Sequence, residues 1–199
     1  ITSTPANVAV GELPAVQAVS VLFDGADGRP LAVLDGTVIT QWRTAADSAL
    51  GSRLLSREDS RHLLVIGAGA MSRPLARAHA SVRPGIETIS VWNRTHDRAV
   101  EIATALVAEG LPARAVTDLD AAVSAADVIT ACTRVSEPLV RGELLRPGTH
   151  VDLVGGFTPT TREADDAVMA RGRVFVDRRE SAFDGLSLIH ISEPTRRRG

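Results

Sequence analysis

The sequence predicts an α/β fold: a doubly wound parallel sheet over roughly residues 60–178, preceded by part of a second structural unit. Three observations favour this fold. From residue 62 onward, short apolar runs alternate with stretches of helical periodicity, the pattern of parallel strands that helices cover on both faces. The first apolar run leads directly into a glycine-rich turn. The residues before 60 instead combine β-branched runs with Asp-Gly turns, which is typical of antiparallel strands.

The segment before residue 60 predicts a small antiparallel meander followed by a helix. Three strands are expected, at residues 16–23, 30–34 and 37–40, because each run is rich in β-branched or apolar residues and Asp-Gly pairs stand between them. From residue 44 to about 55, small and apolar residues recur at three- and four-residue spacing, which predicts a helix. Thr44 or a neighbour is a suitable residue to cap its start.

Strands and helices alternate along the rest of the chain. Strands are expected at residues 62–66, 88–92, 113–116, 127–132, 150–154 and 173–176. Helices are expected at residues 72–82, 96–109, 119–125 and near 162–170. Because helices separate most of these strands, the strands should lie parallel in one sheet.

The composition of the 199-residue chain narrows the classes of protein to which it can belong. Its net charge is −2 and its basic residues are spread along the chain, so an electropositive nucleic-acid surface is not expected. The chain has no Lys, which excludes a lysine nucleophile, and the single Cys132 excludes an internal disulfide and a cysteine-rich zinc site. No apolar run approaches the roughly 18 residues of a membrane span. We therefore expect a cytoplasmic protein with neither nucleic-acid nor membrane partners.

A glycine-rich loop follows the first strand of the alternating series. Gly67, Gly69 and Ser72 form a G-x-G-x-x-S pattern between a strand and a helix. The first glycine permits a tight turn, the second lets the backbone approach a pyrophosphate, and Ser72 stands where a small residue lets helix and strand pack closely. The N–H groups at the start of the helix would then face the phosphates. This context predicts a Rossmann-type dinucleotide-binding domain.

The end of the second strand bears on which dinucleotide is bound. NAD-selective sites usually place Asp or Glu here, where the carboxylate binds the 2′-hydroxyl of the ribose. This chain instead has Asn93, Arg94 and Thr95, and the guanidinium of Arg94 can make a two-point contact with a 2′-phosphate. We therefore expect NADP(H) to be preferred, with NAD(H) possible. The alternative is that Asn93 and Thr95 only cap the next helix and that Arg94 is solvated.

A set of short motifs is spread along the chain, at residues 40–46, 67–70, 92–95, 126–130, 137–138, 147–150, 154–157, 162–163 and 174–177. Together they resemble the ornithine cyclodeaminase/mu-crystallin family, over nearly all of residues 12–185. The Arg-Thr-Ala-Ala and Val-Gly-Gly motifs of this set are far more specific than the glycine loop.

The resemblance implies how the chain is divided. In this family a dimerisation and substrate domain, built from both ends of the chain, flanks a central dinucleotide-binding domain. Residues 1–60 would be part of that α+β domain with its linking helix, residues 61–178 the Rossmann domain, and residues 179–185 the start of the returning segment. The family's earlier segment, which supplies an Arg and a Lys for the substrate carboxylate, would be missing, as would the C-terminal helix. The full-length protein would be a homodimer. Residues 186–199 resemble translated sequencing adapter, and we expect them to be non-native.

The resemblance also implies which residues bind ligands. The implied cofactor-binding residues are Arg43, Thr44, Gly67, Gly69, Ala70, Met71, Asn93, Arg94, Thr95, Thr133, Val154, Gly155 and Phe157. Arg43 would also bind the substrate carboxylate, Thr133 would lie by the nicotinamide ribose, and residues 154–157 would flank the nicotinamide ring. The alternatives are that Arg43 is a surface residue at a helix start and that Thr133 is a plain strand-end hydroxyl. Neither a metal site nor a certain catalytic residue is implied.

One departure from the family pattern bears on the reaction. Cyclodeaminases of this family carry an Asp directly after Val-Gly-Gly as acid and base, whereas this chain has Phe157, which cannot carry a proton. The chain is therefore more similar to the ketimine reductases of the family. These use NAD(P)H to reduce 1-pyrroline-2-carboxylate or 1-piperideine-2-carboxylate to L-proline or L-pipecolate. The alternatives are an NAD-dependent ornithine cyclodeaminase, a non-catalytic NADPH-dependent ligand-binding protein like mu-crystallin, and an amino-acid dehydrogenase.

Overall fold

The computed structural model of the protein describes residues 2–3, 16–156, 158 and 160–176. Phe157, the expected returning segment (179–185) and the expected non-native tail (186–199) lie outside the described residues. The chain forms two compact units, which meet in the sequence between Asp47 and Ser48. None of the helices in the described part of the chain is long and apolar enough to cross a membrane.

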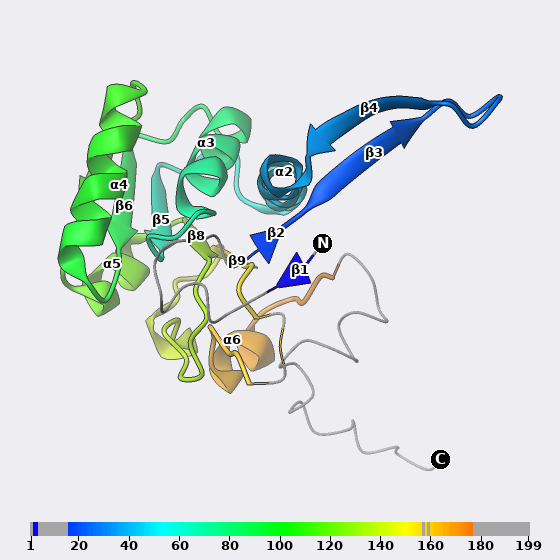
Figure 1. Ribbon diagram of the computed structural model, residues 1–199. Coiled ribbons are helices and arrows are strands. Elements are labelled where there is room, and N and C mark those ends of the chain that lie inside the picture. Colours follow the sequence, from blue (N-terminus) through cyan, green and yellow to red (C-terminus); the bar gives the residue numbers. More distant parts are fainter. Residues whose placement is uncertain (1, 4–15, 157, 159, 177–199) are drawn as a thin grey trace, which may run out of the picture. The chain divides into compact units, whose positions relative to one another are not determined.

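The first unit consists of antiparallel strand pairs and the beginning of a long helix (Figure 1). Its elements are β1 (Thr2–Ser3), β2 (Val16–Gln17), β3 (Val19–Phe23), β4 (Pro30–Asp35) and α2 (Gly36–Leu55). Strand β1 pairs with β2, and β3 pairs with β4 in a hairpin. Gly28 has a φ of 77° in the connecting turn, where its N–H donates to the carbonyl of Asp24. The hairpin that the Asp-Gly chemistry predicts is therefore confirmed.

The strand expected at residues 37–40 is wrong, because α2 already begins at Gly36. The carboxylate of Asp35 accepts hydrogen bonds from the N–H groups of Thr37 (2.8 Å) and Val38 (3.2 Å), which caps the helix start. This Asp-Gly pair thus begins a helix rather than a hairpin. Thr44 lies inside the helix and does not cap it. Arg43 also lies inside α2, so the alternative that placed it at a helix start is wrong too.

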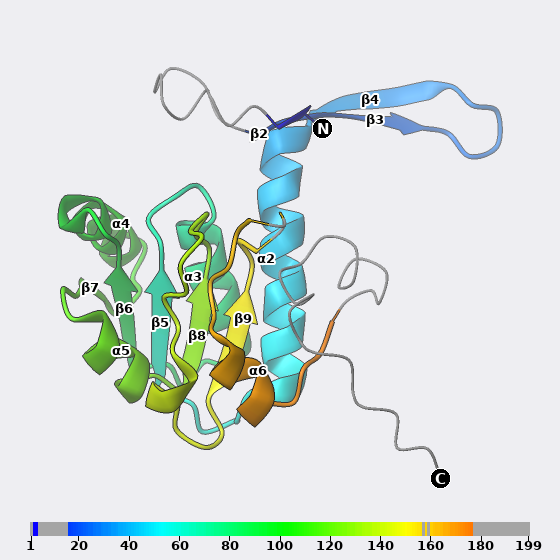
Figure 2. The same ribbon diagram turned by 90° about the horizontal axis from the view of Figure 1, so that it is seen from below.

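The second unit is a five-stranded parallel sheet in the order β7-β6-β5-β8-β9, with helices on both faces (Figure 2). Its strands are β5 (His62–Ile66), β6 (Thr88–Trp92), β7 (Ala113–Ala115), β8 (Val128–Ala131) and β9 (His150–Leu153). Its helices are α3 (Ser72–Val82), α4 (His96–Ala108), α5 (Leu119–Ala125), the 3-10 turn η1 (Gly142–Leu144) and α6 (Asp166–Arg171). The predicted doubly wound α/β class is confirmed.

Two apolar clusters pack on opposite faces of the sheet. Alternate side chains of β5 enter different clusters: Leu63 and Val65 pack with α3 and α4, whereas Leu64 and Ile66 pack with α5 and α6. All four side chains are fully buried. A strand buried on both faces needs a continuous apolar run, and this is why the run at residues 62–66 identified the strand.

One expected strand does not form. Residues 173–176 have no strand pairing within the described part of the chain, and the side chains of Val174, Phe175 and Val176 are exposed. An apolar β-branched run becomes a strand only where a neighbouring strand completes its hydrogen bonds, and the sequence of the run alone does not specify that neighbour.

A buried carboxylate, Asp152, lies between the sheet and the helices of one face. It accepts hydrogen bonds from Thr130 on β8 (2.7 Å), from Ser48 on α2 (3.1 Å) and from Nε2 of His79 on α3 (3.2 Å). Burial opposes ionisation of Asp152, but these hydrogen bonds outweigh it and hold its pKa below the usual range. The carboxylate thus joins β9 to β8, to α3 and to the part of α2 that belongs to the second unit. The side chain of His79 is buried.

The neighbouring His150 predicts a pH-dependent stability. Burial lowers the pKa of His150 to about 4; Arg83 and His79 act in the same direction, and Asp152 opposes them. Between pH 6.5 and about 4 the unfolded chain therefore binds a proton that the folded chain does not bind. We expect the free energy of unfolding to fall by on the order of 3 kcal/mol as the pH falls through this window. Urea unfolding at a series of pH values measures it.

A matched pair of variants tests whether His150 causes this pH dependence of stability. In His150→Gln the group that titrates is gone, so the slope of stability against pH should flatten in this window. His96 is exposed on α4, and His96→Gln should keep the wild-type slope. An unchanged slope in His150→Gln would contradict the assignment.

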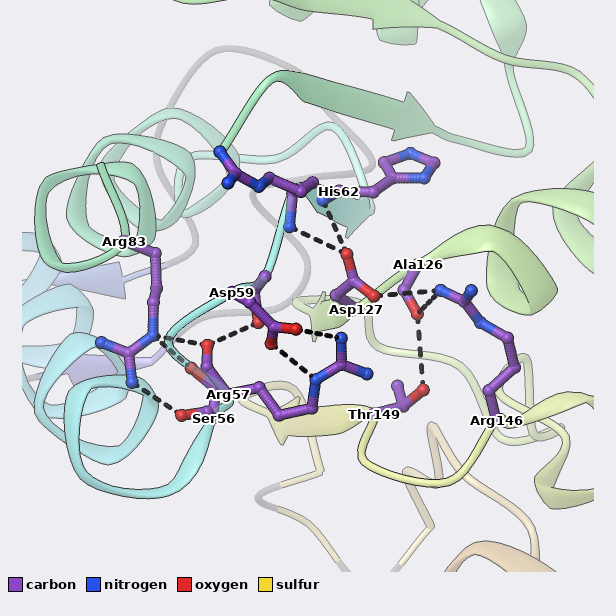
Figure 3. Close-up of polar contacts among 11 residues, drawn as sticks. Ser56, Arg57, Asp59, His62, Arg83, Ala126, Asp127, Arg146 and Thr149 are labelled. Atoms are coloured by element: carbon purple, nitrogen blue, oxygen red, sulfur yellow. Dashed lines mark hydrogen bonds and ion pairs between the residues drawn. The ribbon is translucent and has the colours of Figure 1, made fainter. Parts of the chain in front are cut away.

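The linker from α2 to β5 is fixed at the amino edge of the sheet (Figure 3). The carboxylate of Asp127, just before β8, accepts from the backbone N–H groups of Arg61 (2.8 Å) and His62 (3.1 Å), and it forms an ion pair with Arg146 (3.1 Å). Figure 3 also shows Arg83, which directly follows α3 and whose guanidinium donates to carbonyl oxygens at the end of α2. These contacts hold the ends of α2, α3, β5 and β8 together.

Candidate dinucleotide-binding site

The carboxyl edge of the sheet gathers most of the predicted site residues. From β5 the chain builds the sheet in one direction through β6 and β7, and in the other through β8 and β9. The carboxyl ends of β5 and β8 therefore form a topological switch point, where doubly wound sheets bind ligands. The segments after β5, β6, β8 and β9 carry predicted site residues to this edge (Figure 2). Arg43 and Thr44 belong to the first unit, on α2, where Arg43 is exposed.

The glycine loop after β5 has the two properties that a phosphate loop requires. Gly67 has a φ of 116°, and an added Cβ would lie 3.1 Å from the carbonyl oxygen of Cys132 and from Cγ2 of Thr133. Only glycine adopts this backbone without strain. An added Cβ on Gly69 would meet no atom within 4 Å, so the backbone there borders open space. The loop can therefore turn sharply at Gly67 and receive a ligand at Gly69.

Ser72 fixes the shape of this loop. Its hydroxyl lies 2.9 Å from the carbonyl oxygens of both Gly67 and Gly69 and donates to them, and the residue is fully buried. The prediction that a small residue packs here is confirmed. The hydroxyl's role in holding the loop was missed, although a serine at this position was a visible signal.

The start of α3 faces the loop without a side-chain cap. Met71 is the N-cap residue and makes no side-chain hydrogen bond to the helix. Ala70 beside it is exposed. Uncapped N–H groups at a helix start bind anions, and α3 is long enough to have an appreciable dipole. Residues 69–71 therefore offer backbone donors to a phosphate.

The end of β6 presents an unpaired cation. Arg94 is exposed and forms no ion pair with any residue that the structure describes. Thr95 occupies the N-cap position of α4, but its side chain makes no capping hydrogen bond, and the amide of Asn93 donates to the carbonyl oxygen of Thr95 (2.9 Å). The alternative interpretation, in which Thr95 only caps α4, is therefore correct about the position of Thr95, but the side chain of Thr95 makes no capping hydrogen bond. The guanidinium of Arg94 can still bind an anion.

The loops after β8 and β9 meet at a buried carboxylate that the sequence reasoning did not single out. Glu163 is 2% exposed. One of its oxygens accepts from the N–H (2.5 Å) and the hydroxyl (2.8 Å) of Thr133, and the other accepts from the N–H of Gly155 (2.6 Å). The two loops also touch, because an added Cβ on Gly155 would lie 1.7 Å from the carbonyl oxygen of Thr133. Val154 next to it is half-buried.

Cys132 does not supply a nucleophile here. Burial raises the pKa of the Cys132 thiol to about 12, so the thiolate that a nucleophile requires does not form near neutral pH. Among the described residues, no group of three His, Cys, Asp or Glu side chains could hold a metal ion.

A comparison with protein families identifies the chain. The ornithine cyclodeaminase/mu-crystallin family matches it over residues 1–185. The chain belongs to this family. A member from Paracoccus denitrificans, named delta(1)-pyrroline-2-carboxylate reductase, is 47% identical over 187 residues, which cover 94% of this chain and 57% of that protein. The ketimine reductase mu-crystallin of Mus musculus is 37% identical, over 86% of this chain and 53% of its own length.

Solved structures of family members agree with this assignment. The delta(1)-pyrroline-2-carboxylate reductase of Thermococcus litoralis, in complex with NADH and L-proline, matches with a TM-score of 0.86 at 32% identity, covering 92% of this chain and 56% of that one. The iminosuccinate reductase of Paracoccus denitrificans, in complex with NAD+, matches with a TM-score of 0.78 at 34% identity, covering 91% and 55%. The chain spans about half the length of the relatives it matches. The resemblance that the motifs indicated is confirmed.

Proposed function

We propose that this protein is an NAD(P)H-dependent ketimine reductase, which converts 1-pyrroline-2-carboxylate to L-proline or 1-piperideine-2-carboxylate to L-pipecolate. The observation that carries the proposal is the similarity to the Thermococcus litoralis reductase, whose complex holds both NADH and L-proline. The carboxyl edge of the sheet supports it, because it combines a glycine loop, an uncapped helix start and a free guanidinium at the positions a dinucleotide uses.

The residues present fit a dinucleotide. The space beside Gly69 is open, and the N–H groups of residues 69–71 would hold the pyrophosphate. Thr133, Val154 and Gly155 would lie along the nicotinamide half. When bound, a reduced nicotinamide supplies a hydride to the imine carbon. In our proposal, Arg43 binds the substrate carboxylate, which holds that carbon in position and makes the reaction effectively unimolecular.

The proposed reduction does not require a proton donor at position 157, where this chain has Phe157. The ring nitrogen of the cyclic imine is protonated before reduction, so addition of hydride to the adjacent carbon gives a neutral amine directly. No acid at residue 157 is needed for that step. Ornithine cyclodeamination does need an acid and base on the amine, and a phenyl ring cannot supply either.

A turnover assay tests the function. The protein is mixed with NADPH or NADH and with each of the two cyclic imines, and loss of the reduced cofactor's absorbance is followed. The Paracoccus denitrificans relative serves as a positive control. Binding of cofactor without turnover of either imine would favour the ligand-binding alternative. Release of ammonia from ornithine without added reductant would favour the cyclodeaminase.

We propose that NADP(H) is preferred and that NAD(H) is also accepted, because Arg94 forms no ion pair with any residue that the structure describes and no acidic residue stands at the end of β6. The variant Arg94→Asp should weaken NADPH binding by at least tenfold more than NADH binding, since it removes a charge-assisted contact and adds repulsion to the 2′-phosphate. Titration of cofactor fluorescence measures both affinities. Arg53→Asp makes the same charge change near the end of α2, away from the carboxyl edge, and should change the two affinities equally. Equal losses in Arg94→Asp would contradict the assignment.

The full-length protein is proposed to be a homodimer. The hairpin of β3 and β4 supports this, because most of its large apolar side chains are exposed, including those of Val19, Phe23 and Val33. Contiguous exposed apolar surface of this kind is typical of protein interfaces.

A further inference from the structure

Glu163 is the only acceptor that the structure provides, within its described residues, for three donors at the meeting point of two site loops. The backbone N–H of Thr133 points to one carboxylate oxygen and the backbone N–H of Gly155 to the other. Backbone N–H groups can only donate, so both oxygens of Glu163 must accept. A deprotonated carboxylate satisfies both bonds at once, whereas an amide of the same shape has one acceptor oxygen only.

Burial and the hydrogen bonds act on the pKa of Glu163 in opposite directions, and the net effect is a raised pKa. Burial raises the pKa of Glu163, and Asp152 acts in the same direction, while the hydrogen bonds from Thr133 and Gly155 oppose both. No basic side chain forms an ion pair with Glu163 in the described part of the chain. The carboxylate thus depends on the two loops for its stabilisation, as they depend on it for their position.

The hydrogen bond to Glu163 also determines whether the Thr133 hydroxyl can donate to a ligand or only accept from it. Its hydrogen is donated to Glu163 over 2.8 Å, so Oγ1 keeps lone pairs that can accept but has no hydrogen left to donate. A ligand group that binds Thr133 must therefore be a hydrogen-bond donor, such as a ribose hydroxyl. A phosphate oxygen would find no donor there and would face the negative charge of Glu163.

We infer that Glu163 is a positioning residue for the nicotinamide half of the cofactor: it fixes the loop after β8 to the loop after β9, and it makes the Thr133 hydroxyl an acceptor for a sugar hydroxyl. This inference rests on the proposed function, because it takes the ligand at this edge to be a nicotinamide dinucleotide. Glu163 acts through Thr133 and Gly155 and does not itself touch the ligand.

A comparison of NADH binding with ADP binding distinguishes this positioning role from a general loss of structure. NADH spans the whole edge, whereas ADP occupies only the part that the glycine loop and the end of β6 would bind. In Glu163→Gln, the NH2 group that replaces one carboxylate oxygen cannot accept a hydrogen bond. Beside Thr133 it donates to Oγ1 and leaves the Thr133 N–H without its acceptor; beside Gly155 it leaves the Gly155 N–H without one. We expect NADH binding to be up to about tenfold weaker, as for the loss of one hydrogen bond between neutral groups, with ADP binding unchanged. Equal losses for NADH and ADP, or an unchanged NADH affinity, would overturn the inference.

Thr133 variants test the same inference without altering Glu163. Thr133→Val removes the hydroxyl and should weaken NADH binding about tenfold, while Thr133→Ser restores a hydroxyl and should recover most of that loss. In the double variant with Glu163→Gln and Thr133→Val, the loss should be close to that of either single change, because both remove the same contact. Additive losses would mean that Glu163 does not act through Thr133. Absence of NADH binding by the wild-type protein would count against the proposed function itself.

Discussion

The Gly155→Ala variant is expected to be less stable than the wild type by about 3 kcal/mol and to lose affinity for NADH. The new Cβ would lie 1.7 Å from the carbonyl oxygen of Thr133 and 2.7 Å from Oε1 of Glu163. Thr133 contributes a backbone atom, so relief of the clash requires the loop after β8 to move. That movement would also break the 2.6 Å hydrogen bond between the N–H of Gly155 and Glu163. Urea unfolding and NADH titration measure the two effects.

The control for this variant is the same substitution at Gly51, in the interior of α2. An added Cβ there meets no atom within 4 Å, and alanine is a better helix former than glycine by about 1 kcal/mol. Gly51→Ala should therefore raise stability slightly and leave NADH binding as it is. A Gly155→Ala protein as stable as the wild type would show that the two loops can separate without cost.

The Arg83→Met variant is expected to lose about 3 kcal/mol of stability, because it removes all the hydrogen bonds that a buried guanidinium donates to the end of a helix. Arg83 is 7% exposed, and its guanidinium donates to the carbonyl oxygens of Ser52 (2.9 Å), Arg53 (3.0 Å), Ser56 (2.7 Å) and Arg57 (3.0 Å). These are acceptors at the C-terminus of α2, where the helix dipole favours a cation. Methionine fills a similar volume but offers no hydrogen to these oxygens. Thermal and urea unfolding measure the loss.

An exposed ion pair nearby provides the comparison. Arg57 and Asp59 form two parallel hydrogen bonds in Figure 3, but both side chains are largely exposed. Water can replace such contacts, so Asp59→Asn should have a much smaller effect than Arg83→Met. If Arg83→Met and Asp59→Asn lowered the free energy of unfolding by the same amount, the buried hydrogen bonds of Arg83 would not stabilise the linker more than the exposed ion pair does.

The parts of the fold that local patterns determine could be predicted from the sequence. The strand at residues 62–66 must be apolar throughout because both faces of the sheet are covered, and Gly67 must be glycine because its φ is positive. The start of α2 could not be predicted in this way. An Asp-Gly pair before a β-branched run is compatible with a hairpin turn and with a helix cap. At Asp35 the side chain bonds the next N–H groups and favours the helix.

In the candidate site, too, some residues could be recognised from local sequence, whereas others are brought together only by folding. The glycine loop and Arg94 are recognisable because each lies directly after a strand, so sequence position alone assigns them to the carboxyl edge. Glu163 was noted only as part of a family motif. Its partner Thr133 is 30 residues away, and only folding brings the two together. The role of Ser72 as a donor to two carbonyl oxygens likewise depends on the turn that Gly67 makes.

The order of strands in the sheet has a consequence for how the chain is made. The central strand β5 pairs on one side with β6, which follows soon after it, but on the other side with β8, near residue 130. As the ribosome delivers the chain from its N-terminus, one edge of β5 remains open until β8 has left the exit tunnel. An apolar strand with an open edge is prone to aggregation. Nascent chains of this protein therefore pass through a stage in which chaperones can bind β5.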